Sequence, residues 1–200
     1  MLSATKLTAV LKRIPSQTLT RSLHRAVDLV KLLSIIPPQP LFALGPGLQG
    51  QRFTSKGGPA ALYVSEHPAM AFYEANGLFA NQAALAQSNA PPTVIFTLRV
   101  HLERVLDITD IETQRLLGTT EAELTSAFRW QQLSGGSIPT QILGDAVFHS
   151  ELFQAIRYPS SVDRDRKRRE ENLIIWIDKI TAPSFVEIQD PTGMFAQRIP

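Results

Sequence analysis

The spacing of apolar residues predicts helices and strands that are mixed without regular alternation. Leu7, Val10 and Leu11 recur at helical spacing ahead of Pro15, whereas the segment Ala-Ala-Leu-Tyr-Val-Ser at 60–65 is typical of a short buried strand. In chain order, the pattern predicts a helix at 3–13, a helix or strand at 17–33, turns at 37–59, a strand at 60–65, a helix at about 67–87, strands at 93–101 and 105–108, a helix from 120 to about 130, a helix at 138–150, and strands at 154–158, 172–178 and 184–189. This order favours an α+β fold, with mixed sheets and flanking helices, over a doubly wound sheet.

Two of these helices have recognisable starts. Ser65 is placed to cap the helix expected from about 67, and Pro68 falls in its first turn, where the missing N–H costs nothing. Thr120 and Glu123 have the spacing of a capping box. Both starts support the helical assignments.

Glu74 is the single formally charged side chain between His67 and Leu98. Its neighbours at helical spacing are apolar, and so is most of the opposite side of the helix, which predicts a buried helix. A carboxylate buried without a partner costs roughly several kcal/mol, so it must be paired or lie at a cleft. Glu74 is therefore either a partly exposed residue at a helix edge or a functional carboxylate in an apolar cleft, and the pattern favours the second interpretation.

Composition limits the classes of protein that fit. The 200 residues suffice for one domain, and 44% hydrophobic with 19% charged residues describe an ordinary globular chain. The chain contains no cysteine, which excludes disulfides, thiolate metal sites and cysteine nucleophiles and is compatible with a cytoplasmic location. Its net charge of +2 gives no case for direct nucleic acid binding, and its longest apolar stretch, 29–36, is too short for a membrane span. No acidic residue precedes Asp28, so a transit peptide is an alternative to a first amphipathic helix.

Three weaker motifs are set aside. Gly45, Gly47 and Gly50 match G-x-G-x-x-G, but the residues that follow do not begin a helix, as a dinucleotide-binding loop requires. The four histidines show no ligand spacing, so no metal is expected. The charged run 164–171 mixes signs and is typical of a solvated loop, with protein docking as the alternative.

The first half of the chain resembles the RES domain, a family named for an Arg, a Glu and a Ser. The resemblance rests on Arg52 in Gly-Gln-Arg-Phe-Thr-Ser-Lys-Gly-Gly, Tyr63 in Ala-Leu-Tyr-Val-Ser, and Glu74 in Ala-Phe-Tyr-Glu. The three residues fall at equal intervals of eleven, which is similar to the spacing in the family. Arg25, in His-Arg-Ala-Val, resembles the arginine that opens the first strand of the domain.

The second half carries further segments of the same family. They are Pro-Thr-Gln-Ile-Leu-Gly at 139–144, Ile-Arg-Tyr-Pro-Ser-Ser at 156–161 and Asn-Leu-Ile-Ile at 172–175. Ser160 is the candidate for the family serine, with Ser161 as the alternative. The resemblance predicts a helical extension at 1–21 and a RES domain at 22–200. The chain departs from compact members by extra helix around 110–130.

The resemblance implies an ADP-ribosyltransferase-like fold and an NAD+-consuming activity. Members of the family are bacterial toxins that cleave the nicotinamide–ribose bond of NAD+, their substrate, and that are neutralised by an antitoxin with an Xre-type DNA-binding domain. Hydrolysis and phosphorolysis both fit, and transfer of ADP-ribose to a cellular protein is an alternative. A non-catalytic interaction module on the same scaffold is a second alternative, and a homodimer is possible.

The residues suit this chemistry. The nicotinamide of NAD+ is already a cationic leaving group, so its departure needs no general acid. A single carboxylate, Glu74, can then stabilise the oxocarbenium-like transition state. Arg52 and Arg25 offer planar donors for the pyrophosphate. Tyr63 can stack on the nicotinamide ring, and Ser160 can donate a hydrogen bond to the ribose or the amide. Taken singly, an arginine such as Arg52 is more often a surface loop residue and a tyrosine such as Tyr63 more often a core aromatic, so the prediction depends on their combination with Glu74.

Overall fold

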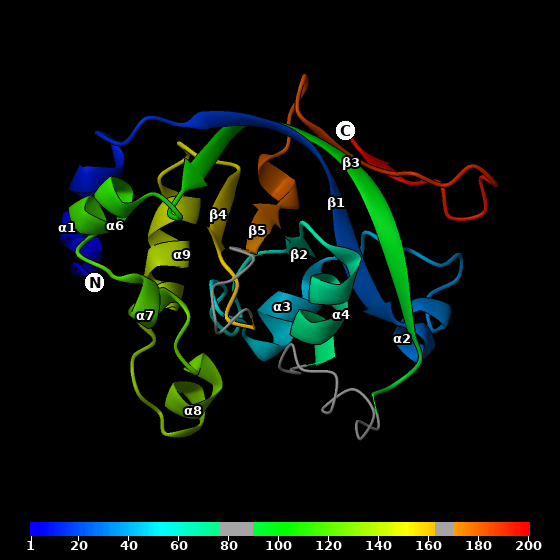
Figure 1. Ribbon diagram of the computed structural model, residues 1–200, viewed down its shortest axis with the longest axis horizontal. Helices are drawn as coiled ribbons and strands as arrows, with labels where there is room; N and C mark the ends of the chain where they lie inside the picture. The colour runs from blue at the N-terminus through cyan, green and yellow to red at the C-terminus, as the bar shows by residue number, and fades with distance from the viewer. Residues whose placement is uncertain (77–89, 163–169) are drawn as a thin grey trace.

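The computed structural model describes residues 1–76, 90–162 and 170–200, and these form an α+β fold, as predicted (Figure 1). The elements are α1 (Ala4–Leu11), β1 (Gln17–Asp28), α2 (Leu29–Leu33), α3 (Leu44–Gln49), β2 (Ala61–Ser65), α4 (Pro68–Asn76), β3 (Thr93–Asp107), α6 (Ile111–Leu117), α7 (Glu121–Leu124), α8 (Phe128–Leu133), α9 (Pro139–His149), β4 (Ala155–Pro159), β5 (Glu171–Trp176), a 3-10 turn (Ile177–Lys179), β6 (Phe185–Ile188) and β7 (Arg198–Ile199).

The strands form one mixed sheet that closes on itself. The order is β1-β2-β5-β4-β3-β6-β7, and an additional antiparallel pairing of β1 with β3 closes the first five strands into a ring. β1 and β3 are the longest strands and arch together over the remainder of the sheet (Figure 1). Among the strands of the described residues, β3 and β4 are the one pair that runs parallel. β1 meets β2 at a single pair, His24 opposite Ser65, so the ring is narrowly closed there.

Alternation along the strands divides the core into two clusters. In β2, Leu62 and Val64 belong to one cluster with side chains of β1, β3 and β6, whereas Ala61 lies in the other. β5 alternates in the same way, because successive side chains of a strand point to opposite faces. Helices α1, α6, α7 and α9 cover the second face and bury its cluster.

Several predicted boundaries were wrong for identifiable reasons. The strands expected at 93–101 and 105–108 are one strand, β3, which continues through the polar residues Glu103 and Arg104 without a break. The helix predicted from 120 to 130 starts with the expected cap, in which Thr120 Oγ1 accepts from Glu123 N–H, but it stops at Leu124 and α8 follows as a separate turn. The ambiguous segment 17–33 is a strand followed by the short helix α2.

Other differences concern elements that apolar periodicity did not indicate. The turn-rich stretch 37–59 contains the short helix α3, and β7 near the C-terminus was not predicted. The helix expected at 67–87 is described only as far as Asn76, and its remainder lies outside the described residues. In the described ranges, no helix combines the length and apolarity needed to cross a bilayer.

Helix α9 supports the loop that carries Arg52. Its Gln141 side-chain amide donates to the Gln51 carbonyl at 2.9 Å, and Asp145 accepts from Ser55 Oγ at 2.6 Å. Between these two contacts, Gly144 lies directly under the loop, and a Cβ placed there would come within 1.9 Å of the Phe53 carbonyl oxygen. The loop can approach this closely only because residue 144 has no side chain.

We therefore expect Gly144→Ala to destabilise the protein by about 1–3 kcal/mol, because backbone atoms on both sides must move apart. The free energy of unfolding measured with urea tests this. Gly136→Ala is the control, since a Cβ at Gly136 makes only ordinary contacts, at 3.5 Å to Gln131 O and 3.6 Å to Ser134 Oγ, and its stability should be equal or slightly higher. Equal stability of Gly144→Ala and the wild type would show that the loop does not rest on the helix.

Candidate active site

The carboxylate of Glu74 lies at the meeting point of α4, β4 and β5. Its Oε1 accepts a hydrogen bond from Ser160 Oγ at 2.7 Å and a second from Asn172 Nδ2 at 2.8 Å. Both donors are about 1% exposed, whereas Glu74 itself is half-buried. Ser160 follows β4 directly, and Asn172 is the second residue of β5. Hydrogen bonds from two adjacent strands, β4 and β5, therefore hold the carboxylate of α4 in place.

The register of the sheet explains why these donors lie together. Asn172 is opposite Ser65 on β2 and opposite Tyr158 on β4, so the three side chains form one row across the sheet. Residues paired in this way project from the same face. Ser160 lies immediately beyond this row, where its N–H donates to the Glu170 carbonyl at 2.9 Å. A polar row thus faces α4 at one end of three strands.

Tyr158 is a member of this row that sequence reasoning did not single out. Its ring is buried and packs against Phe53 with centroids 4.7 Å apart. Burial, reinforced by the negative charge of Glu74, raises the pKa of its phenol well above the usual value, so the group is neutral. Asn172 was likewise quoted only as part of a segment. The signal for both was the strand register, which the sequence does not specify.

Arg52 is buried and is anchored by the segment between α7 and α8. Its Nη1 donates to the carbonyls of Leu124 at 2.7 Å and Ser126 at 2.8 Å, and its guanidinium lies 5.0 Å from the centroid of the Phe128 ring. Burial lowers the pKa of Arg52, while Tyr158, Glu74 and Tyr63 act in the opposite direction. The part of the extra segment around 110–130 that runs from Leu124 to Phe128 therefore forms the wall that fixes this arginine.

Tyr63 lies in the middle of β2, on the same face as the polar row. Its hydroxyl accepts from the Phe53 N–H at 3.0 Å and is 3.0 Å from Thr54 Oγ1. Burial, above all, raises the pKa of this phenol. The hydroxyl therefore holds the loop next to Arg52, so the structure brings Arg52, Tyr63, Glu74 and Ser160 together.

Arg25 is not part of this group. His24 is opposite Ser65 and shares its face, so Arg25 points to the other face of the sheet. There its Nη2 donates to the Phe42 carbonyl at 2.7 Å, and burial lowers the pKa of its guanidinium to about 10. A role for Arg25 in pyrophosphate binding stays a prediction that these contacts do not support. Of the two candidate serines, Ser160 contacts Glu74, and Ser161 makes no hydrogen bond to it within the described part of the chain.

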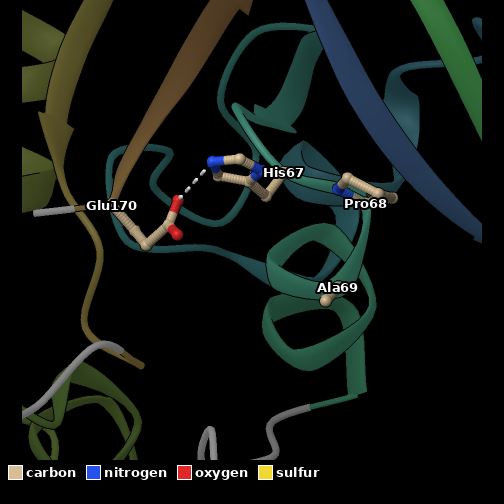
Figure 2. Close-up of a pocket in the computed structure, with 4 residues that line it drawn as sticks. All are labelled: His67, Pro68, Ala69 and Glu170. Atoms are coloured by element: carbon tan, nitrogen blue, oxygen red, sulfur yellow. Dashed lines mark ion pairs between the residues drawn. The ribbon is translucent and has the colours of Figure 1, made fainter. Parts of the chain in front are cut away.

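An open hollow of about 510 Å³ lies at the start of α4 (Figure 2). It is lined by His67, Pro68, Ala69 and Glu170, and the imidazole of His67 faces the carboxylate of Glu170, with Nε2 and Oε2 3.6 Å apart. Its lining does not include Glu74. Glu170, which lines the hollow, accepts a hydrogen bond at its carbonyl from the N–H of Ser160, the residue that contacts Glu74. We define the candidate site by the hydrogen-bonded group around Glu74, with this hollow at its side.

Within the described residues, no group of three or more His, Cys, Asp or Glu is arranged to hold a metal ion.

The fold is a closed mixed sheet, and at the site two buried neutral donors of this sheet bind the carboxylate of one helix residue, Glu74. The chain belongs to the RES domain family, which it matches over residues 22–196. It is also similar in fold to a chain in the crystal structure of the M. tuberculosis MbcT–MbcA toxin–antitoxin complex, with a TM-score of 0.63 and 14% identity, covering 92% of this chain and 90% of that chain. A search of curated proteins gives no match.

We expect Arg52→Lys to lower the free energy of unfolding by about 1–3 kcal/mol, because a lysine cannot reproduce both carbonyl contacts together with the stacking on Phe128. Chemical denaturation measures the difference. Arg129→Lys is the matched control, since Arg129 also lies over the Phe128 ring, at 5.6 Å, but is exposed and should change stability by less than about 0.5 kcal/mol. Equal losses in the two variants would contradict the anchoring role of Arg52.

Proposed function

We propose that this protein is a toxin of a toxin–antitoxin system that consumes NAD+ by cleaving the bond between nicotinamide and ribose. The observation that carries the proposal is the state of Glu74. Both donors converge on Oε1, and within the described residues no donor reaches Oε2. One oxygen is thus fixed in place while the other is left to interact with a substrate.

The chemistry requires little beyond this carboxylate. In hydrolysis, NAD+ and water give nicotinamide, ADP-ribose and a proton; in phosphorolysis, inorganic phosphate takes the place of water and gives ADP-ribose 1″-phosphate. In both reactions the glycosidic C–N bond breaks with its electron pair going to nicotinamide, which leaves neutral. Positive charge then develops on the ribose, and Glu74 Oε2 stabilises it or holds the 2″-hydroxyl of the same ribose.

The other residues of the site have compatible roles. Arg52 uses only Nη1 for its contacts to Leu124 and Ser126, so the remaining guanidinium donors are available for the pyrophosphate. Tyr63 is half-buried, and its ring can cover one face of the nicotinamide. Ser160 donates its one hydroxyl proton to Glu74, so we propose that its oxygen accepts a hydrogen bond from the ribose or the amide.

The toxin assignment is supported by family membership and by the solved complex. The similar chain comes from a toxin–antitoxin complex, and we propose that this protein, too, is neutralised in the cytoplasm by a partner protein with an Xre-type domain. A homodimer remains compatible with the proposal. Transfer of ADP-ribose to a cellular protein is the alternative reaction, because the acceptor is selected outside the group around Glu74.

Purified wild-type protein should release nicotinamide from NAD+, and Glu74→Gln should reduce kcat by about 100-fold or more while the fold is retained. The swap is nearly isosteric but removes the negative charge that the transition state needs. Glu187→Gln is the matched control, because Glu187 is a hydrogen-bonded carboxylate that accepts from Arg99 Nε at 3.0 Å and lies on β6, which pairs with β3 and β7 and not with the strands of the site. Its kcat should be unchanged.

Three arms identify the reaction: buffer without phosphate, buffer with phosphate, and a cell extract with labelled NAD+. Free ADP-ribose indicates hydrolysis, its 1″-phosphate indicates phosphorolysis, and labelled protein indicates transfer. If folded wild-type protein leaves NAD+ intact in all three arms, the enzymatic proposal fails and the non-catalytic interaction module becomes the better interpretation.

A further inference from the structure

Asn172 combines a well-placed donor with an unsatisfied acceptor. The residue is about 1% exposed, and its Nδ2 donates to Glu74 Oε1 at 2.8 Å. Its Oδ1 is buried and has no hydrogen-bond partner among the described residues. A buried, unpaired carbonyl lowers stability, and such groups are rare in native proteins unless function requires them. The unpaired Oδ1 of Asn172 therefore suggests that this asparagine has a function beyond packing.

The orientation of the side chain follows from Glu74. If the carboxamide were turned over, Oδ1 would face Glu74 Oε1, and two acceptors would repel each other. The amide therefore keeps its N–H toward the carboxylate, even though this leaves Oδ1 unpaired. The backbone around Asn172 cannot adjust, because β5 is paired on both sides, with Ser65 and Tyr158 opposite. The donor is mounted on a rigid part of the sheet.

We infer that Asn172 is a positioning residue, which fixes the Glu74 carboxylate so that Oε2 faces the reacting ribose; this rests on the proposed function. Ser160 alone gives one contact, about which the carboxylate can still swing. A second donor from a neighbouring strand fixes the position of Oε1, and the free oxygen is then fixed as well. Because Asn172 is neutral, it does this without cancelling the negative charge.

Two substitutions separate positioning from filling space. Asn172→Leu removes the donor and also the unpaired acceptor, with the same number of side-chain heavy atoms. We expect kcat to fall about 10- to 100-fold, the typical effect of losing a hydrogen bond to a charged group. KM should stay within about twofold, and the melting temperature within about 4 °C of the wild type. Asn172→Asp is closest in shape but places a second carboxylate against Glu74, so its kcat should be about tenfold lower again.

The control is a buried carboxamide remote from the site. Gln114 is 7% exposed, and its Nε2 donates to the Ile108 carbonyl at 2.9 Å. Gln114→Leu should show the opposite result, with a lower melting temperature and an unchanged kcat, because it leaves a buried carbonyl unpaired without touching the carboxylate.

The order of kcat in wild type, Asn172→Leu and Asn172→Asp decides the question. The inference is overturned if Asn172→Asp has a higher kcat than Asn172→Leu, or if Asn172→Leu has the kcat of the wild type, because the hydrogen bond would then not determine turnover.

If wild-type protein has no NAD+ turnover, the proposed function fails, and the crystal structure of Asn172→Leu decides the positioning role separately. Displacement of the Glu74 carboxylate from Ser160 Oγ supports that role, and an unchanged carboxylate refutes it.

Discussion

The hydrogen bonds that two strands make to one oxygen of Glu74 are the contacts on which the site is built. A carboxylate on an apolar helix must be solvated by the protein once the helix packs against a sheet. Here Ser160 and Asn172 provide that solvation, and both are buried so deeply that they cannot turn away toward water. The helix is consequently locked to the strand ends at the point where the carboxylate is needed.

The remainder of the site depends on packing between segments far apart in the sequence. The loop that carries Arg52 is held from α9 by Gln141 and Asp145, from β2 by the Tyr63 hydroxyl, and from the segment after α7 through the arginine itself. None of these holding contacts involves Glu74. The arginine and the carboxylate are therefore positioned independently, each by its own part of the fold, and the pairing of β2 with β5 brings these two parts together.

This independence explains what the sequence could and could not predict. The lone charge of Glu74 was visible because apolar neighbours isolate it, and α9 was visible from its periodicity. Asn172 and Tyr158 were not, because their importance arises from strand register, and register depends on contacts made across the sheet. Arg25 was placed beside the other arginine by motif order, but the parity of β1 turns it to the opposite face. The sequence shows where a residue stands along a strand. Which face of the sheet its side chain occupies depends on the register of that strand against its neighbours.

The two faces at the strand ends stabilise carboxylates in contrasting ways. On the face opposite Glu74, the guanidinium of Arg157 pairs with Asp107 at 3.1 Å and with Glu171, so charge meets charge. The neighbours of these residues along the same two strands, Tyr158 and Asn172, face Glu74 and are neutral. A cation hydrogen-bonded to Glu74 would hold it more tightly, but it would also cancel the field that stabilises a developing positive charge on a sugar. Neutral donors fix the position of the carboxylate and preserve its charge, which is the combination that the proposed reaction needs.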